Sequence, residues 1–270
     1  MLFEEAMQAE QAAVWRDFLS LQCALFSPGE IEVLKELGLA HDRGPLLDLG
    51  CGNGAYALRL RQRFPRLEIL GADSSTALLR DFSDDIKASG IGGIRVMRWA
   101  AGQEPPPAEV GGCRSALLSV FLQHVAVPLD ILAALRQALP AQARVFIIEE
   151  DDGLCVADPP CPPLDRLLRV WNERHCGTRT FGRRVPGLAR QAGLRVDDVR
   201  VCAHSTVRLG AEALFGYFKA TLPLLLDERP GGLGRGQAIE LARDLDRYVA
   251  EHGPRCCVIF PRMVVSATVP

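Results

Sequence analysis

The sequence lacks an excess of charge of either sign. Its 270 residues contain 31 lysines and arginines against 33 aspartates and glutamates, a formal net charge of -2, and neither end carries a basic or acidic tail. Nucleic-acid-binding proteins need a concentrated basic surface that neutralises phosphates. The composition therefore argues against a nucleic-acid partner and favours a small, neutral one.

The sequence also lacks an apolar run of the roughly 18 residues that a membrane span needs. Glu4 and Glu5 stand near the start, where a secretory signal would carry basic residues. We therefore expect a cytoplasmic protein without membrane contacts. Nine cysteines are present, but none are in C-x-x-C spacing. They predict reduced thiols, and neither they nor the histidines predict a metal site.

What the chain does have is a regular alternation of short apolar segments with helical patterns. After two N-terminal helices, expected at 5–22 and 28–39, strands are expected at 45–49, 67–72, 94–98, 116–121 and 143–149, with helices at 54–64, 76–88 and 129–139. Strand and helix alternating in this way predict a parallel sheet with helices on both faces.

The alternation breaks after Glu150 and resumes later. Residues 151–181 are rich in proline and are expected to form an insertion; a helix at 183–192, a strand at 195–207, helices at 211–226 and 236–252 and a last strand at 256–268 follow. Together these elements predict an α/β fold with a doubly wound, mostly parallel, seven-stranded Rossmann-like sheet.

A glycine loop is the sharpest chemical signal. Residues 46–54 read Leu-Leu-Asp-Leu-Gly-Cys-Gly-Asn-Gly, a buried strand that runs into a glycine-rich turn before a helix. Glycines permit a positive φ and a close approach of ligand to backbone, and the start of the helix supplies amide donors. The next strand ends in Asp73-Ser74, a spacing that suits a carboxylate holding ribose hydroxyls.

The same spacing also fits a dinucleotide-binding fingerprint, through Gly50, Gly52, Ala55 and Asp73. An NAD(P)-dependent oxidoreductase is therefore an alternative. Asp48 disfavours it, because a carboxylate just before the first glycine would repel a pyrophosphate, whereas it would attract an ammonium group.

The stretch LLDLGCGNG resembles the first motif of class I S-adenosylmethionine-dependent methyltransferases of the small-molecule type, residue for residue. ALLSVFLQHV resembles the fourth strand of that family, RQALPAQARVFIIEED its fifth strand with the preceding helix and turn, and GRRVPGLARQAGLRVDDVRV the approach to its sixth strand. The resemblance covers roughly residues 15 to 207 and implies a last strand that runs antiparallel to the others.

The resemblance implies methyl transfer to a small-molecule acceptor, on oxygen or nitrogen, with S-adenosylmethionine as the cofactor. It implies one domain over 1–270, with N-terminal helices at 1–43, a cofactor-binding core at 44–150 and insertions at 151–181 and 208–254. The residues expected to bind the cofactor are Asp48, Gly50, Cys51, Gly52, Gly54, Asp73, Ser74, Trp99, Ala100 and Ser119.

The sequence departs from the family pattern after the third strand. Where an acid commonly lies near the adenine, this chain has Arg98-Trp99-Ala100-Ala101-Gly102. Adenine is then expected to rest against Trp99 and to form hydrogen bonds with backbone amides. The missing acid keeps a second alternative open, a methyltransferase-like binding or regulatory protein without turnover.

The acceptor half of the site is less readable. His124 follows the fourth strand and is a candidate general base for a hydroxyl acceptor, although a role in starting a helix or packing the core is equally open. The two insertions carry aromatic side chains that the sheet does not need. Together with the N-terminal helix around Trp15 and Phe18, we expect them to form a helical cap that closes over the acceptor. At least one of Trp171, Phe215 and Phe218 should line a cavity beside the methyl group.

Overall fold

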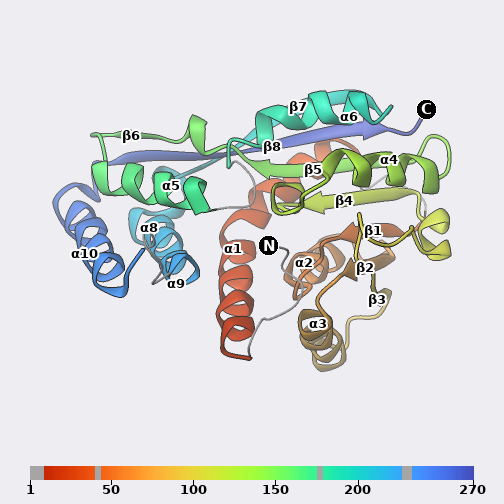
Figure 1. Ribbon diagram of the computed structural model, residues 1–270, viewed down its shortest axis with the longest axis horizontal. Helices are drawn as coiled ribbons and strands as arrows, with labels where there is room; N and C mark the ends of the chain where they lie inside the picture. Colours follow the sequence, from red (N-terminus) through yellow and green to blue (C-terminus); the bar gives the residue numbers. More distant parts are fainter. Residues whose placement is uncertain (1–8, 40–43, 175–178, 227–232) are drawn as a thin grey trace.

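A computed structural model describes residues 9–39, 44–174, 179–226 and 233–270 (Figure 1). Its sheet has the order β3-β2-β1-β4-β5-β8-β6, and β7 pairs with the other side of β8. The strands are β1 (Leu46–Leu49), β2 (Ile69–Asp73), β3 (Ile94–Arg98), β4 (Ser115–Ser119), β5 (Arg144–Glu150), β6 (Val156–Asp158), β7 (Arg195–Ser205) and β8 (Cys257–Thr268). Strands β1 to β5 are parallel, and β8 runs antiparallel to its neighbours β5, β6 and β7. The predicted mostly parallel fold with an antiparallel last strand is confirmed.

The prediction of seven strands is wrong by one. The additional strand is the short β6, which lies inside the segment expected to be an insertion. Strand β8 has 12 residues and β5 has 7, so β8 extends past the end of β5. Val156–Asp158 pair with Cys257–Ile259 on this overhang and satisfy backbone groups that would otherwise form a free edge.

The N-terminal region forms one helix where we predicted two. Helix α1 (Ala9–Glu36) runs through Pro28 without ending. An interior proline removes one hydrogen bond and costs about 3 kcal/mol or more. The packing on both sides of it offsets that cost: Phe26 and Leu34 are fully buried, and the Phe26 ring lies against those of His204, Tyr217 and Phe260.

The helix expected at 211–226 is in fact two. Helix α8 (Ala211–Ala220) ends at Thr221, and α9 (Leu222–Leu225) begins with Pro223 in its first turn. Proline suits the first turn of a helix and not its interior, so it marks the break.

Helices cover both faces of the parallel part of the sheet. Helices α4 (Pro128–Ala138) and α6 (Val185–Gln191) pack on one face. The C-terminal half of α1, α2 (Ala55–Arg63) and α3 (Thr76–Ser89) pack on the other. The carboxyl ends of β1, β2 and β4 are thereby left at one edge between the two layers, where open α/β sheets bind ligands.

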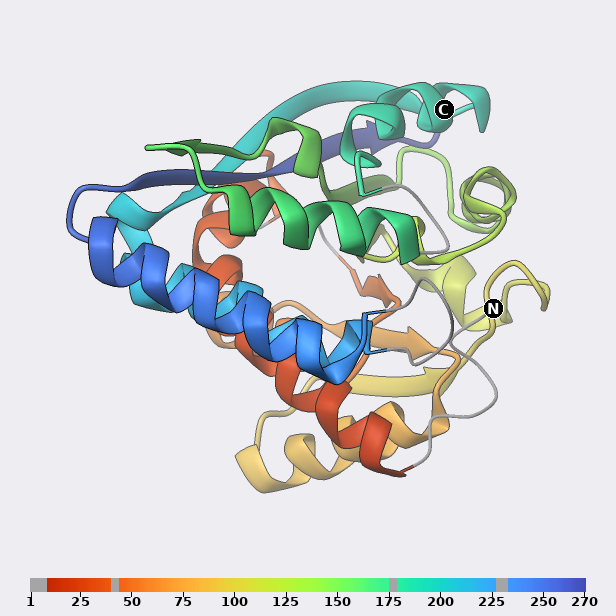
Figure 2. The ribbon, with the colours of Figure 1, turned by 60° about the vertical axis from the view of Figure 1, so that its left-hand side comes forward.

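A third hydrophobic cluster lies beside the sheet. It is formed by α5 (Pro162–Arg174), α8, α9 and α10 (Arg235–His252), which we call the helical lobe, together with side chains of α1 and the start of β8. Figure 1 shows the lobe on the left, the parallel strands on the right and α1 between them. Figure 2 brings the lobe forward, with α5 and α10 in front. The N-terminal half of α1 is therefore shared by the lobe and the ligand edge.

A buried ionic network connects these parts. Arg262 of β8 donates to Glu30 of α1 (2.8 Å) and to Glu150 of β5 (2.7 Å). Arg179 lies 2.6 Å from Glu150 and 2.6 Å from Asp152. Burial alone would raise the pKa of Glu150, but the guanidinium groups of Arg179 and Arg262 outweigh it and hold the pKa at about 2. Each of these five buried side chains is paired with at least one other of them. Removing one side chain therefore leaves a buried charge without its partner.

Replacing Arg262 by alanine should lower the free energy of unfolding by about 3–5 kcal/mol, because Glu30 and Glu150 would be left as buried charges. Urea denaturation measures the change. The matched control is Arg63→Ala, which breaks an ion pair between the half-exposed Arg63 and Glu32 and should leave stability nearly unchanged. Similar small losses in both variants would show that the interior network contributes little.

Candidate active site

The glycine loop joins β1 to α2 through three left-handed glycines. Gly50, Gly52 and Gly54 have φ values of 76°, 54° and 74°. The amides of Gly50 and Cys51 both donate to the carbonyl of Ala72 on the neighbouring strand, at 2.8 and 3.1 Å. A Cβ at Gly54 would overlap the ring of Phe82. The loop therefore needs glycine for conformation and for space, and it sets the start of α2 at the carboxyl edge of the sheet.

Asp73 at the end of β2 is tied to this loop. One carboxylate oxygen accepts from the amide of Gly52 and the other from that of Ser75, both at 2.9 Å. Asp73 and Ser74 also line a cavity at this edge. The two hydrogen bonds thus fix the orientation of a carboxylate that belongs to the cavity wall.

The cavity, which we call the larger cavity, has a volume of about 330 Å³ and a mostly apolar lining. It contains six of the residues predicted from sequence: Gly50, Gly52, Asp73, Ser74, Trp99 and His124. Trp15 of α1, expected to help close over the acceptor, lines one side of the cavity together with Leu19. Other lining residues were not among the expected site residues and include Leu78, Gln103, Val125, Ala126 and Val127.

Trp99 and Ala100 are held by an acid that the sequence analysis missed. The Trp99 indole Nε1 donates to the carbonyl oxygen of Glu104 (3.2 Å), and the amide of Ala100 donates to the Glu104 carboxylate (3.2 Å). Trp99 lines the larger cavity, whereas Ala100 is buried behind it. Ala100, expected to bind the cofactor, thus lies behind the cavity wall with its amide bonded to Glu104.

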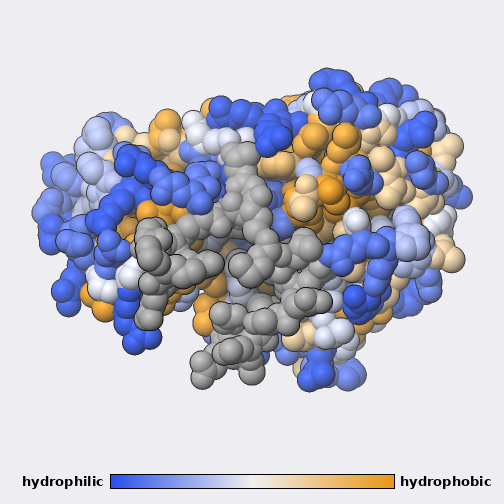
Figure 3. All heavy atoms as spheres, viewed as in Figure 1, coloured by the Kyte–Doolittle hydropathy of each residue, from blue (hydrophilic) through white to orange (hydrophobic). Residues whose placement is uncertain are grey.

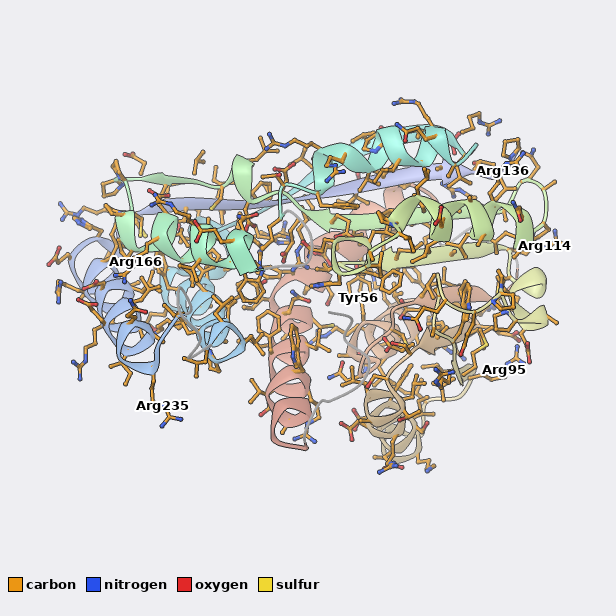
Figure 4. The ribbon with its side chains drawn as sticks, in the orientation of Figure 1. Tyr56, Arg95, Arg114, Arg136, Arg166 and Arg235 are labelled. Atoms are coloured by element: carbon orange, nitrogen blue, oxygen red, sulfur yellow. The ribbon has the colours of Figure 1, made fainter. Side chains whose placement is uncertain are left out.

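A smaller cavity of about 50 Å³ adjoins the larger one and shares Leu19, Gly50 and Gly52 with it. Asp48, Cys51 and Ser119, all predicted to bind the cofactor, are among its lining residues, with Glu30 and Arg262 of the ionic network. Tyr56 of α2 also lines it and lies near the middle of the molecule in Figure 4, whereas the labelled arginines lie at the periphery. The glycine loop therefore separates a larger, mostly apolar cavity from a small polar one.

Asp48 is poised to receive a cation. Its side chain is 2% exposed, and its Oδ2 has no hydrogen-bond partner among the described residues. Burial, with a smaller contribution from the Asp73 carboxylate, raises the pKa of Asp48 to about 7. A positively charged group in the smaller cavity would stabilise the ionised form and relieve both effects.

The aromatic residues expected to contact the acceptor lie elsewhere. Trp171, Phe215 and Phe218 belong to the core of the helical lobe and line neither cavity. Phe215 stacks on Tyr248, with ring centroids 5.4 Å apart, and Arg179 lies 4.6 Å from the Trp171 ring. These side chains fill the interior of the lobe, so the expected contact is not found in this structure. The α1 side chains Trp15 and Leu19 lie at the cavity instead.

The acidic run 149–152 spans the end of β5 and the two residues after it. All four carboxylates are buried. Asp151 accepts from the amide and guanidinium of Arg183, Asp152 pairs with Arg179, and Glu149 accepts from the amides of residues 121 and 122. The sequence showed the acids but not the distant partners that hold them inside.

Among the residues that the structure describes, no group of three or more histidine, cysteine, aspartate or glutamate side chains is arranged to hold a metal ion. Within the same residues, no helix is long and apolar enough to cross a membrane.

Comparison with known proteins agrees with this site. The family model described as "Methyltransferase domain" matches residues 46–141, which include the glycine loop, Asp73 and the segment after β4. The sequence has no significant match among curated proteins.

Solved structures share the fold at low sequence identity. A Bacillus halodurans protein described as a methyltransferase has a TM-score of 0.59 at 12% identity, over 88% of this chain and 98% of its own. A phosphoethanolamine N-methyltransferase of Haemonchus contortus has a TM-score of 0.54 at 16% identity, over 89% of this chain and 52% of its own. The [4+2]-cyclase SpnF has a TM-score of 0.53 at 17% identity, over 84% of this chain and 75% of its own.

The sheet order and the glycine loop define a class I methyltransferase fold. Within this fold, the core of the chain at residues 46–141 is similar to a methyltransferase domain.

The residues present fit this cofactor. Asp73 suits the two ribose hydroxyls, and the unpartnered Oδ2 of Asp48 suits the ammonium of the methionine end. The apolar wall that contains Leu78 and Trp99 suits adenine. S-adenosylmethionine is therefore the cofactor that the site takes, and the nicotinamide alternative is not supported.

Replacing Asp73 by alanine should weaken binding of S-adenosylhomocysteine at least tenfold. Each lost charge-assisted hydrogen bond is worth about 1.5–3 kcal/mol, and the loop would also lose its anchor at Gly52. Calorimetry measures the affinity. Asp84→Ala, at an exposed position of the following helix, is the control and should bind normally. Normal binding by a folded Asp73→Ala variant would contradict the assignment.

Affinity for S-adenosylhomocysteine should rise about tenfold between pH 6 and pH 8. Only about a tenth of Asp48 is ionised one unit below a pKa of about 7, so binding an ammonium at lower pH requires release of a proton. The Asp48→Asn variant cannot release this proton and should show a much flatter profile by calorimetry. The same rise in both proteins would assign the dependence to another group.

Proposed function

We propose that the protein transfers a methyl group from S-adenosylmethionine to the oxygen or nitrogen of a small, largely apolar acceptor. The observation that carries this proposal is the lining of the larger cavity. Beyond the glycine loop and Asp73, it continues into apolar side chains of α1 and of the segment after β4, including Trp15, Val125 and Val127. On the face seen in Figure 3, apolar side chains gather over this segment, beside the residues drawn in grey. A largely apolar pocket with few polar groups is typical of small-molecule sites.

The chain's own residues would act mainly by position and by excluding water. The cofactor supplies an electrophilic methyl group on a sulfonium, whose leaving group departs without a proton. Holding the acceptor at the carboxyl end of β4 then provides much of the rate enhancement. Leu19 and Trp15 of α1 cover the cavity from one side and would keep water away from the acceptor.

His124 would remove the proton of a hydroxyl acceptor. It lies in the short 3-10 helix Leu122–His124, is half-buried and lines the larger cavity. An imidazole side chain beside the acceptor can serve as the general base that a hydroxyl group needs. An amine acceptor that binds unprotonated would need this group less, so the effect of its removal distinguishes the two acceptor types.

The function is tested by incubating the protein with S-adenosylmethionine and a panel of phenols, carboxylic acids and primary and secondary amines. Formation of S-adenosylhomocysteine with at least one acceptor, above the rate without acceptor, is the expected result. Tight cofactor binding without turnover of any acceptor would favour the alternative of a binding or regulatory protein. That outcome would also fit a non-methylating activity on this fold, as the structural similarity to a [4+2]-cyclase allows.

With a hydroxyl acceptor, His124→Ala should lower kcat by about 10²- to 10⁴-fold, the usual contribution of a general base. Affinity for S-adenosylhomocysteine should stay within about twofold, since this residue is assigned to proton transfer. Steady-state kinetics and calorimetry give the two values. An unchanged kcat would show that His124 is not the general base.

A further inference from the structure

The turn after β4 has a strained backbone. Val120 has a φ of 51°, in the left-handed region. A β-branched residue is an outlier there, so such a conformation persists only where its surroundings enforce it. The hydrogen bonds of this turn should therefore identify what enforces it.

The end of β5 supplies those bonds. The amide of Val120 donates to the carbonyl of Ile148 at 2.7 Å. The next two amides, of Phe121 and Leu122, donate to a single oxygen of the Glu149 side chain, at 2.9 and 2.6 Å. Glu149 is fully buried. Three consecutive amides are thus held by two consecutive residues of one strand, and two of the three depend on one side chain.

The segment that begins with this turn also forms part of the wall of the larger cavity. Six residues of 120–127 line the larger cavity: Val120, Phe121, His124, Val125, Ala126 and Val127. The Phe121 ring packs directly on Gly50, where a Cβ would overlap it. A displacement of the turn would therefore move the cavity wall and release the first glycine of the loop.

Glu149 differs from the three carboxylates that follow it. Glu150, Asp151 and Asp152 each form an ion pair with an arginine, whereas Glu149 forms none with the described residues. Burial is the main cause that raises the pKa of Glu149 to about 8. The group is then largely neutral at pH 7 and acts as a hydrogen-bond acceptor, a role that a glutamine side chain can reproduce.

We propose that Glu149 is a positioning residue, which holds the strained turn at Val120–Leu122 so that Phe121 supports the glycine loop and the cofactor cavity keeps its shape. The inference depends on the cofactor and not on the identity of the acceptor. Failure of the proposed methyl transfer would leave it standing, because it is tested by binding alone.

The test compares Glu149→Ala with Glu149→Gln, using calorimetry with S-adenosylhomocysteine and urea denaturation. The alanine variant should bind at least about tenfold more weakly, because two amides lose their acceptor and the turn relaxes. The glutamine variant keeps that acceptor and should bind within about threefold of the wild type. If the alanine variant does not fold, Glu149→Asp replaces it. The aspartate side chain is shorter by one methylene and should not reach the two amides, so this variant should also bind at least about tenfold more weakly.

Asp151→Ala is the matched control, because Asp151 is a buried carboxylate two residues along whose bonds go to Arg183 and not to the turn. It should lose stability while its affinity for S-adenosylhomocysteine stays within about twofold. Equal loss of affinity in the Asp151 and Glu149 variants would reduce Glu149 to a general structural role. Full affinity in a folded Glu149→Ala variant would also overturn the proposal.

Discussion

The interior position of the Arg262 guanidinium is the constraint on which the arrangement of the molecule depends. A buried charge must be paired, and Arg262 finds its partners on α1 and β5. Tyr217 of the helical lobe donates to the same glutamate, Glu150. The sheet, the first helix and the lobe thus meet at one point, and the ionic contacts specify how they fit in a way that apolar contacts alone would not.

The hydrogen bond between Arg262 and Glu30 also fixes the position of α1. Its C-terminal half covers the sheet, its middle supplies Glu30 to the network, and its N-terminal half passes between the lobe and the ligand edge. Phe18 packs into the lobe against Tyr217, while Trp15 and Leu19 line the cavity. The same helix therefore contacts both the lobe and the cavity. The aromatic side chains Trp171, Phe215 and Phe218 of the lobe line neither cavity.

Local signals in the sequence predicted the parallel sheet and the glycine loop at its edge. The strand at 94–98 and the glycine loop depend on residues next to one another, and both were predicted with correct bounds. Features that depend on distant partners were missed. Strand β6 exists because β8 extends past β5, and the buried Glu150 and Asp152 are compensated by Arg262 and Arg179, which lie 112 and 27 residues further along the chain. The course of α1 through Pro28 likewise depends on tertiary packing.

Strand β8 belongs to two hydrophobic interiors at once. Val258 and Phe260 lie in the core of the lobe, whereas Val265 and Ala267 lie in that of the sheet. Neither interior can open fully while this strand stays in place, and neither keeps all its contacts once the strand detaches. Strand β8 therefore completes both cores together, so that lobe and sheet should behave as one cooperative unit rather than as two that melt separately.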